Sequence, residues 1–161
     1  MGTEIERKFL VASSDWHEGV ASRSEIRQGF LNTEPERTVR ISLADGDAQL
    51  TIKGITVGAQ RAEYEYPIPP RDGAEMLDRL CQHALIEKTR YRVPHAGNTW
   101  EVDVFYGANA GLVVAEIELA SAEEAFKLPS WIGTEVTSDP RYYNASLVHH
   151  PYSDWGKPDA R

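Results

Sequence analysis

The 161-residue chain has a single cysteine, Cys81, so no disulfide can form within it. One thiol without a partner suits a reducing compartment, which predicts a cytoplasmic location. The chain has no uninterrupted apolar run long enough to span a bilayer. It also has no apolar segment near its start that would predict a signal peptide. These absences argue against a membrane partner.

Positive charge is also scarce, because 17 Lys and Arg stand against 25 Asp and Glu, for a net charge of −8. General nucleic-acid binders usually carry a basic surplus, so this balance argues against a nucleic-acid partner. The sequence contains no P-loop, no nucleophile elbow and no clustered cysteines. The isolated residues His17, His83 and His95 show no spacing typical of a metal site.

What remains is the composition of a soluble globular protein, with 41% hydrophobic and 26% charged residues. A chain of this length favours one domain with a sizeable core. We assign residues 1–150 to this domain and residues 151–161 to a polar C-terminal tail. No internal repeat or low-complexity tract divides the chain.

The opening stretch 4–9 carries the first pattern that indicates chemistry. Its apolar residues predict a strand, and alternate residues of a strand share a face. Glu4, Glu6 and Lys8 therefore lie together. Hard cations take oxygen ligands and an ammonium binds phosphate, so this face suits a divalent cation beside an anion. A single strand of this kind could equally be a solvated sheet edge, so the interpretation depends on whether other strands repeat it.

Alternating hydrophobicity predicts about eight strands, mostly joined as sequential hairpins. The clearest hairpin turns at Asp45–Gly46. Gly29 marks a bulge or a close approach of another segment. The predicted strands are residues 4–9, 23–32, 38–43, 48–53, 61–68, 87–93, 99–105 and 111–119. This pattern predicts an antiparallel α+β protein.

Helices are predicted between and after the strands. Residues 72–85 form the clearest one, because apolar residues recur at helical spacing and Asp72 can cap the first turn. Residues 121–124 open a short helix that Pro129 ends. Residues 138–140 cap a last helix of about two to three turns.

Charged residues of one sign recur two positions apart on strand after strand, which a randomly solvated sheet would not show. The acids on these faces are Glu4, Glu6, Glu63, Glu65, Glu101, Asp103, Glu116 and Glu118, and the bases are Lys8, Arg40, Lys53, Lys88, Arg90 and Arg92. In a closed barrel these faces would line the interior. Burying acidic and basic side chains together costs free energy unless they form ion pairs with one another or bind a ligand. A polyanion with Mg²⁺ or Mn²⁺ fits such a lumen; the alternative is an ion-pair network without a ligand.

Glu116 and Glu118 carry the most weight, because apolar residues surround them and predict a buried strand. Two carboxylates buried there are costly without a metal. For the charges of segment 87–105, a hairpin surface or a sheet edge remains an alternative.

Taken in order, these motifs resemble those of the CYTH superfamily, the triphosphate tunnel metalloenzymes. The matching segments are 4–9, 28–31, 38–41, 50–54, 63–65, 87–91, 101–105, 115–119 and 139–144. The resemblance implies an eight-stranded antiparallel β-barrel with a charged tunnel, flanking helices and a C-terminal helix. It also implies two divalent ions, Mg²⁺ or Mn²⁺, and a small-molecule triphosphate substrate.

Short bacterial members that look like this chain are typically inorganic triphosphatases, which cleave tripolyphosphate to pyrophosphate and phosphate. The resemblance assigns Lys8, Arg40, Lys53, Lys88 and Arg90 to the phosphates. It assigns the metals to Glu4, Glu6, Glu116 and Glu118, supported by Glu63, Glu65 and Asp103. Glu4, Glu6, Lys8 and Lys88 are the candidate catalytic residues, with Lys88 stabilising or protonating the leaving group.

The chain departs from the family pattern at two positions. Ser42 stands where many relatives have a second arginine, and Arg37 or Arg92 is a candidate to compensate. Phe30 stands where relatives often have tyrosine, so a phenol is absent. Both departures bear on rate and substrate preference more than on the fold.

Three other functions stay open. A class IV-type adenylate cyclase would need adenine contacts, which the sequence does not locate. A thiamine triphosphatase would need an aromatic platform, for which Trp16, Trp100 and Trp131 are candidates. A polyphosphate-binding module would hold the chain without hydrolysis. A homodimer is an open alternative to a monomer.

Overall fold

The computed structural model describes residues 2–156. Its strands are β1 (Thr3–Val11), β2 (Ser22–Asn32), β3 (Thr38–Ala44), β4 (Asp47–Lys53), β5 (Gln60–Ile68), β6 (Ile86–His95), β7 (Asn98–Phe105), β8 (Val113–Glu118) and β9 (Ile132–Glu135). Its helices are α1 (Pro70–Arg79) and α2 (Asn144–His149), with 3₁₀ turns η1 (Asp15–Gly19), η2 (Gly107–Asn109), η3 (Pro140–Tyr142) and η4 (Tyr152–Asp154).

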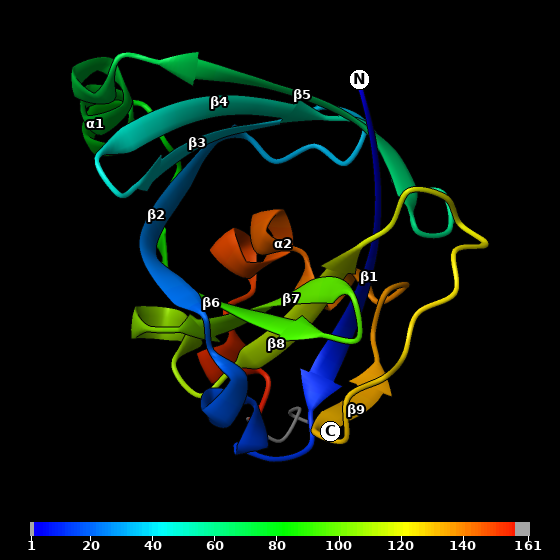
Figure 1. Ribbon diagram of the computed structural model, residues 1–161. Helices are drawn as coiled ribbons and strands as arrows, with labels where there is room; N and C mark the ends of the chain where they lie inside the picture. Colours follow the sequence, from blue (N-terminus) through cyan, green and yellow to red (C-terminus); the bar gives the residue numbers. More distant parts are fainter. Residues whose placement is uncertain (1, 157–161) are drawn as a thin grey trace, which may run out of the picture.

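The strands form one antiparallel sheet that closes into a barrel, as Figure 1 shows in a view into the ring of strands. The order is β5-β4-β3-β2-β6-β7-β8-β1-β9, and a further pairing between β5 and β1 joins the ends. Strands β1 to β8 are therefore the predicted eight-stranded barrel, which is confirmed.

Strand β1 makes this closure because different parts of it pair with different neighbours. Residues 3–5 pair with β5, residues 6–10 with β8, and residues 9–11 with β9. The extra strand β9 was not predicted from sequence. It has only four residues, too few for a clear alternation of apolar and polar side chains, and its pairing with β1 defines it.

The hairpin between β3 and β4 is confirmed. Asp45 and Gly46 are its two turn residues, with φ of 54° and 82°. Two residues with positive φ match the right-handed twist of the flanking strands, which explains the preference for Asp-Gly.

The prediction of a helix over residues 72–85 is wrong at both ends. Helix α1 begins at Pro70 and ends at Arg79, and Pro69 rather than Asp72 is its N-cap. Proline at the first helical position has no N–H to satisfy and a φ suited to the helix. Leu80, one of the apolar residues whose spacing predicted the longer helix, is 64% exposed.

The chain after α1 leaves the helical path and packs against the barrel at Gly29. A Cβ built at Gly29 would lie 2.7 Å from Cys81 Cβ and 2.8 Å from Leu85 Cδ2. The close approach predicted at this glycine is therefore confirmed, and any larger residue would push this segment away.

Two other helix predictions need correction. Residues 121–124 form a turn rather than a helix, in which Ala120 N–H donates to Glu124 Oε1 at 2.6 Å. The single last helix is divided into η3 and the six-residue α2. Asp139 nevertheless caps η3, because its side chain accepts a hydrogen bond from Arg141 N–H.

The apolar core lies in three clusters around the barrel wall. The first contains Trp16, Trp100 and Trp131, which are 3%, 0% and 6% exposed. The second packs α2 against β2 and β6–β8, and the third packs α1 against Ile41. The predicted tail begins at Pro151, but Tyr152 and Trp155 pack against the second cluster. The rest of that tail, residues 157–161, lies outside the described residues.

Candidate active site

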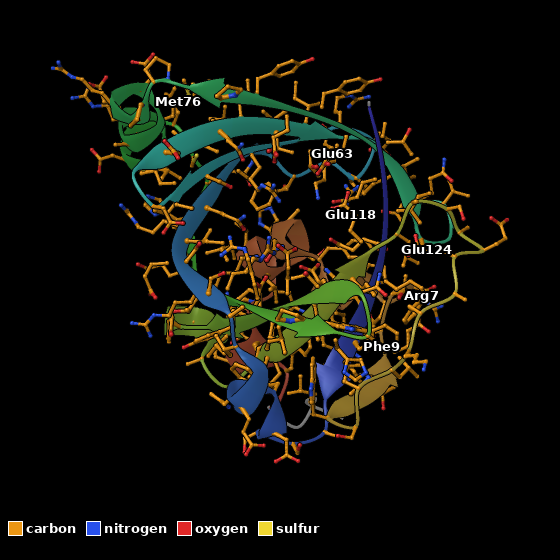
Figure 2. All side chains as sticks on the ribbon, in the orientation of Figure 1. Arg7, Phe9, Glu63, Met76, Glu118 and Glu124 are labelled. Atoms are coloured by element: carbon orange, nitrogen blue, oxygen red, sulfur yellow. The ribbon has the colours of Figure 1, made fainter. Side chains whose placement is uncertain are left out.

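A cavity of about 610 Å³ lies inside the barrel. Its charged lining consists of Glu4, Glu6, Glu63, Glu65, Glu101, Glu116, Glu118, Lys8, Arg40, Lys53, Arg61 and Arg90. Figure 2 shows Glu63 and Glu118 inside the ring of strands, whereas Arg7 and Phe9 of β1 lie outside it. The predicted division of β1 into a charged inner face and an opposite outer face is thus present.

Arg61 is the charged cavity residue that the sequence did not lead us to expect. It lies on β5 two positions before Glu63, so the alternation that placed Glu63 and Glu65 inside could also have placed Arg61 there. The candidates to compensate for Ser42 do not line the cavity. Arg37 pairs with Glu34 at the surface, and Arg92 donates to Ser22 Oγ at 3.4 Å.

On one wall of the cavity, Glu116 lies between two cations. Lys8 Nζ is 3.4 Å from Glu116 Oε2, and Arg90 Nη2 is 3.1 Å from Glu116 Oε1. Burial alone would raise the pKa of Glu116, but Lys8 and Arg90 outweigh burial and hold it well below its usual range. Glu116 is therefore a carboxylate at neutral pH.

Glu6 behaves in the opposite way. Burial raises its pKa well above the usual range, and the negative charges of Glu116 and Glu4 raise it further. The difference follows from their surroundings, because Lys8 and Arg90 pair with Glu116, whereas Glu6 is buried beside the charges of Glu116 and Glu4.

Strands β4 and β5 form another wall of the cavity and contribute the cations Lys53 and Arg61. Lys53 Nζ is 3.1 Å from both carboxylate oxygens of Glu4 and 3.4 Å from Glu63 Oε2. Burial raises the pKa of Glu63, and Glu4 raises it further. Arg61 lines the same side of the cavity.

Arg40 has unused hydrogen-bonding capacity. Its Nη2 donates to Thr51 Oγ1 at 3.4 Å and lies 3.7 Å from Glu65 Oε2. Its buried Nε has no hydrogen-bond partner among residues 2–156. A buried donor without a partner is costly, so a bound anion would stabilise this guanidinium.

Lys88 and Asp103 lie in the barrel wall but do not line the cavity. Their side chains are 0% and 2% exposed, with Lys88 Nζ 2.7 Å from Asp103 Oδ2. Arg90 also donates to both oxygens of Asp103, at 2.8 and 2.9 Å. Burial lowers the pKa of Lys88. Burial would raise the pKa of Asp103, but Arg90 and Lys88 outweigh it and lower that pKa.

The two departures from the family pattern have clear positions. Phe30 lines the cavity and pairs with Arg40 across β2 and β3. Ser42 accepts a hydrogen bond from Gln28 Nε2 at 3.1 Å, so an uncharged pair occupies the place predicted for a second base. The tryptophans proposed as an aromatic platform are core residues and do not line the cavity.

Within the described part of the chain, no three Asp, Glu, His or Cys side chains are already drawn together as a metal site. The donor set nevertheless fits a hard cation, because acids outnumber bases on the cavity wall and every acid offers carboxylate oxygens. Burial first, and then Glu116 and Glu4, raise the pKa of Glu6, so a cation beside these carboxyls would favour the charged form of Glu6. No helix within residues 2–156 is long and apolar enough to cross a membrane.

A barrel enclosing paired carboxylates and cations is the arrangement that the sequence motifs led us to expect. A match to the family described as "CYTH domain" covers residues 2–152, so the chain belongs to the CYTH family. The resemblance stated from the motifs is confirmed.

Relatives and a solved structure agree with this assignment. The chain is 46% identical over 155 residues to an inorganic triphosphatase of Acetivibrio thermocellus, covering 96% of this chain and 99% of that protein. It is 39% identical over 152 residues to an inorganic triphosphatase of Nitrosomonas europaea, covering 91% and 97%. The crystal structure of the inorganic triphosphatase NE1496 superposes with a TM-score of 0.65 at 35% identity, covering 90% and 97%.

Proposed function

We propose that this chain is a metal-dependent inorganic triphosphatase that hydrolyses tripolyphosphate to pyrophosphate and phosphate. The observation that carries the proposal is the enclosed cavity, in which cations and a larger number of carboxylates face one another. The names of the two relatives and the NE1496 structure support the same activity.

The cations of the cavity bind the phosphate chain in this proposal. Arg40 offers its unpartnered Nε, and Lys8, Lys53 and Arg90 present ammonium and guanidinium groups from other strands. These fixed positive charges also stabilise the negative charge that develops on the leaving pyrophosphate. Arg61 is added to the predicted set because it lines the same cavity.

The carboxylates Glu4, Glu6, Glu116 and Glu118 hold the metal, Mg²⁺ or Mn²⁺, with Glu63 and Glu65 in support. The bound ion supplies neutralisation of phosphate charge and a lowered pKa for a coordinated water. The chain itself orients the phosphates and excludes bulk water from the cavity.

Lys88 and Asp103 act through Arg90 rather than on the phosphates directly in this proposal. Both oxygens of Asp103 already bind Arg90, and one of them also binds Lys88. Their ion pairs fix the orientation of the guanidinium. This revises the roles that the resemblance implied for Lys88 and Asp103.

We further place the protein in the cytoplasm, acting on a small-molecule triphosphate rather than on nucleic acid or a membrane. The net charge of −8 and the single thiol support this placement. Size-exclusion chromatography with light scattering decides between a monomer and a homodimer.

The test is to incubate the protein with tripolyphosphate, ATP or thiamine triphosphate, with Mg²⁺, Mn²⁺ or EDTA, and to identify the products. We expect pyrophosphate and phosphate from tripolyphosphate, only with metal. Glu118→Gln should abolish the activity, while the matched control Glu123→Gln, at an exposed position outside the cavity, should not. Cyclic AMP from ATP, or tight binding without turnover, would contradict the proposal.

A further inference from the structure

The segment that follows β9 reaches two buried ammonium groups of the barrel. Lys8 Nζ donates a hydrogen bond to the Tyr142 carbonyl oxygen at 3.2 Å, and Lys88 Nζ donates to Asn144 Oδ1 at 3.4 Å. An ammonium has three donors, and each of these lysines pairs with only one carboxylate within 4.0 Å among the described residues. The C-terminal segment therefore supplies a second acceptor to each of the two lysines.

Tyr142 lies in a short turn that depends on contacts with its surroundings. It belongs to η3, a three-residue 3₁₀ turn, and such short turns need support from their surroundings. Tyr142 packs against the second core cluster, and part of its support comes from Trp155, whose ring centroid lies 4.9 Å from the ring of Tyr142 in an edge-to-face arrangement. The guanidinium of Arg141 also lies 5.0 Å from the Trp155 ring centroid.

Trp155 is itself attached to the body of the protein. Its Nε1 donates to the His150 carbonyl at 3.0 Å, and its ring contacts Tyr152 at 5.1 Å. The backbone N–H of Tyr152 donates to Oδ1 of Asn109, a residue only 3% exposed. A continuous series of contacts thus joins the body of the protein to the Lys8 ammonium through Trp155.

We propose that Trp155 is a positioning residue for Lys8: its ring fixes Tyr142, whose carbonyl oxygen holds the Lys8 ammonium at the cavity. The role of Lys8 on the phosphates rests on the function proposed above; the contact between Tyr142 and Lys8 does not. Without Trp155, the flexible lysine side chain loses this backbone acceptor and keeps its pair with Glu116, at 3.4 Å, and its contact with the Tyr143 ring, whose centroid is 5.4 Å away. Displacement of such a group by about 1 Å can cost roughly 100-fold in rate.

The first test measures the position of Lys8 without turnover. Lysines are reductively methylated under native conditions, and the modified peptides are quantified by mass spectrometry. In Trp155→Ala we expect Lys8 to react at least about tenfold faster than in the wild type, because its carbonyl partner is released. Lys53 should keep its rate, since it lies in the same cavity but its ion pairs within residues 2–156 are with β1 and β5.

The second test measures catalysis with two matched variants. Trp155→Ala should lower kcat/KM for tripolyphosphate by roughly 10- to 100-fold, and Trp155→Phe should restore most of the loss because a phenyl ring can still pack on Tyr142. Trp16→Ala is the control for simple loss of packing, since Trp16 is buried in the first core cluster and does not line the cavity. It should lower the melting temperature without changing kcat/KM or Lys8 reactivity.

Unchanged Lys8 reactivity in Trp155→Ala would overturn the proposal. Equal effects in Trp16→Ala would also overturn it, because they would reveal general loosening rather than positioning. A wild-type protein that fails to hydrolyse tripolyphosphate would refute the proposed function, and the methylation rates would still decide the role of Trp155.

Discussion

Lys8 and Glu116 lie directly opposite each other on β1 and β8, with Nζ 3.4 Å from Oε2. Glu116 also pairs with Arg90, so one carboxylate is shared by two cations. Glu6, on the same strand as Lys8, has no cation of its own within 4.0 Å among the described residues and lies beside Glu116 and Glu4. The proposal places a metal ion beside this carboxyl, which has no ion pair among the described residues.

Glu6→Gln should stabilise the metal-free protein while abolishing triphosphatase activity. The folded state raises the pKa of Glu6, so it favours the protonated form of this carboxyl. The contribution of Glu6 to folding stability is therefore complete below the ordinary pKa of 4.5 and is lost as the pH rises through the folded-state value. At pH 8 in EDTA, the neutral amide should raise the free energy of unfolding by on the order of 1 kcal/mol. Urea denaturation at pH 8 and pH 4 measures this, with Glu36→Gln at an exposed position as the control. A destabilised Glu6→Gln at pH 8 would show that Glu6 makes a favourable contact that the metal-free structure does not reveal.

Asp103→Asn should destabilise the protein more than Lys88→Met. The asparagine leaves both Lys88 and Arg90 without their shared carboxylate, at a cost of about 3 kcal/mol. In Lys88→Met the carboxylate of Asp103 keeps its two hydrogen bonds from Arg90, so the loss of folding stability is smaller. Chemical denaturation of both variants at pH 7 gives the comparison. A larger loss in Lys88→Met would mean that Lys88, not Asp103, anchors this cluster.

Acid should weaken the wild type more than Asp103→Asn. The folded state lowers the pKa of Asp103, so its contribution is complete above the ordinary value of 3.8 and is lost as the pH falls below it through the folded-state value. The stability difference between the two proteins should therefore be constant from pH 7 to pH 5 and shrink below about pH 4. Thermal unfolding of both proteins at a series of pH values tests this. A stability difference between them that grows as the pH falls would contradict the prediction.

Phe30→Tyr should raise kcat/KM for tripolyphosphate by up to about tenfold, since a hydrogen bond to a charged group contributes about 1.5 kcal/mol. Phe30 lines the cavity opposite Arg40, so a phenol there can donate to a phosphate oxygen. Phe30→Leu, which adds no donor, is the matched control and should not gain activity. If Phe30→Tyr folds normally and is no faster, the wall beside Arg40 does not contact the phosphates.

Most strands could be predicted because many of them alternate apolar and polar side chains, whereas the closed eight-stranded barrel followed from the resemblance to the CYTH superfamily. The same alternation placed Glu4, Glu6 and Lys8 of β1 on the cavity wall. It could not show that Lys88 and Asp103, on the same strand faces as Arg90 and Glu101, are fully buried rather than part of the cavity lining. Their position depends on how far along the barrel each residue lies, which follows from strand register rather than from alternation.

The errors lie where tertiary contacts decide local structure. Helix α1 ends at Arg79 because the following residues pack on Gly29, although their apolar spacing would continue a helix. Strand β9 depends on pairing with the end of β1. Residues 152–155 look polar in sequence, yet Tyr152 and Trp155 supply the rings that pack on Tyr142 and the second core cluster.

The most direct measurement is the anomalous scattering of Mn²⁺ in crystals of Glu118→Gln soaked with Mn²⁺ and tripolyphosphate. The account predicts triphosphate density inside the barrel between Arg40, Lys53 and Arg90, with an anomalous peak within about 2.5 Å of carboxylate oxygens of Glu4, Glu6 or Glu116. Triphosphate and manganese bound only on the outer surface, with the cavity unchanged, would contradict it.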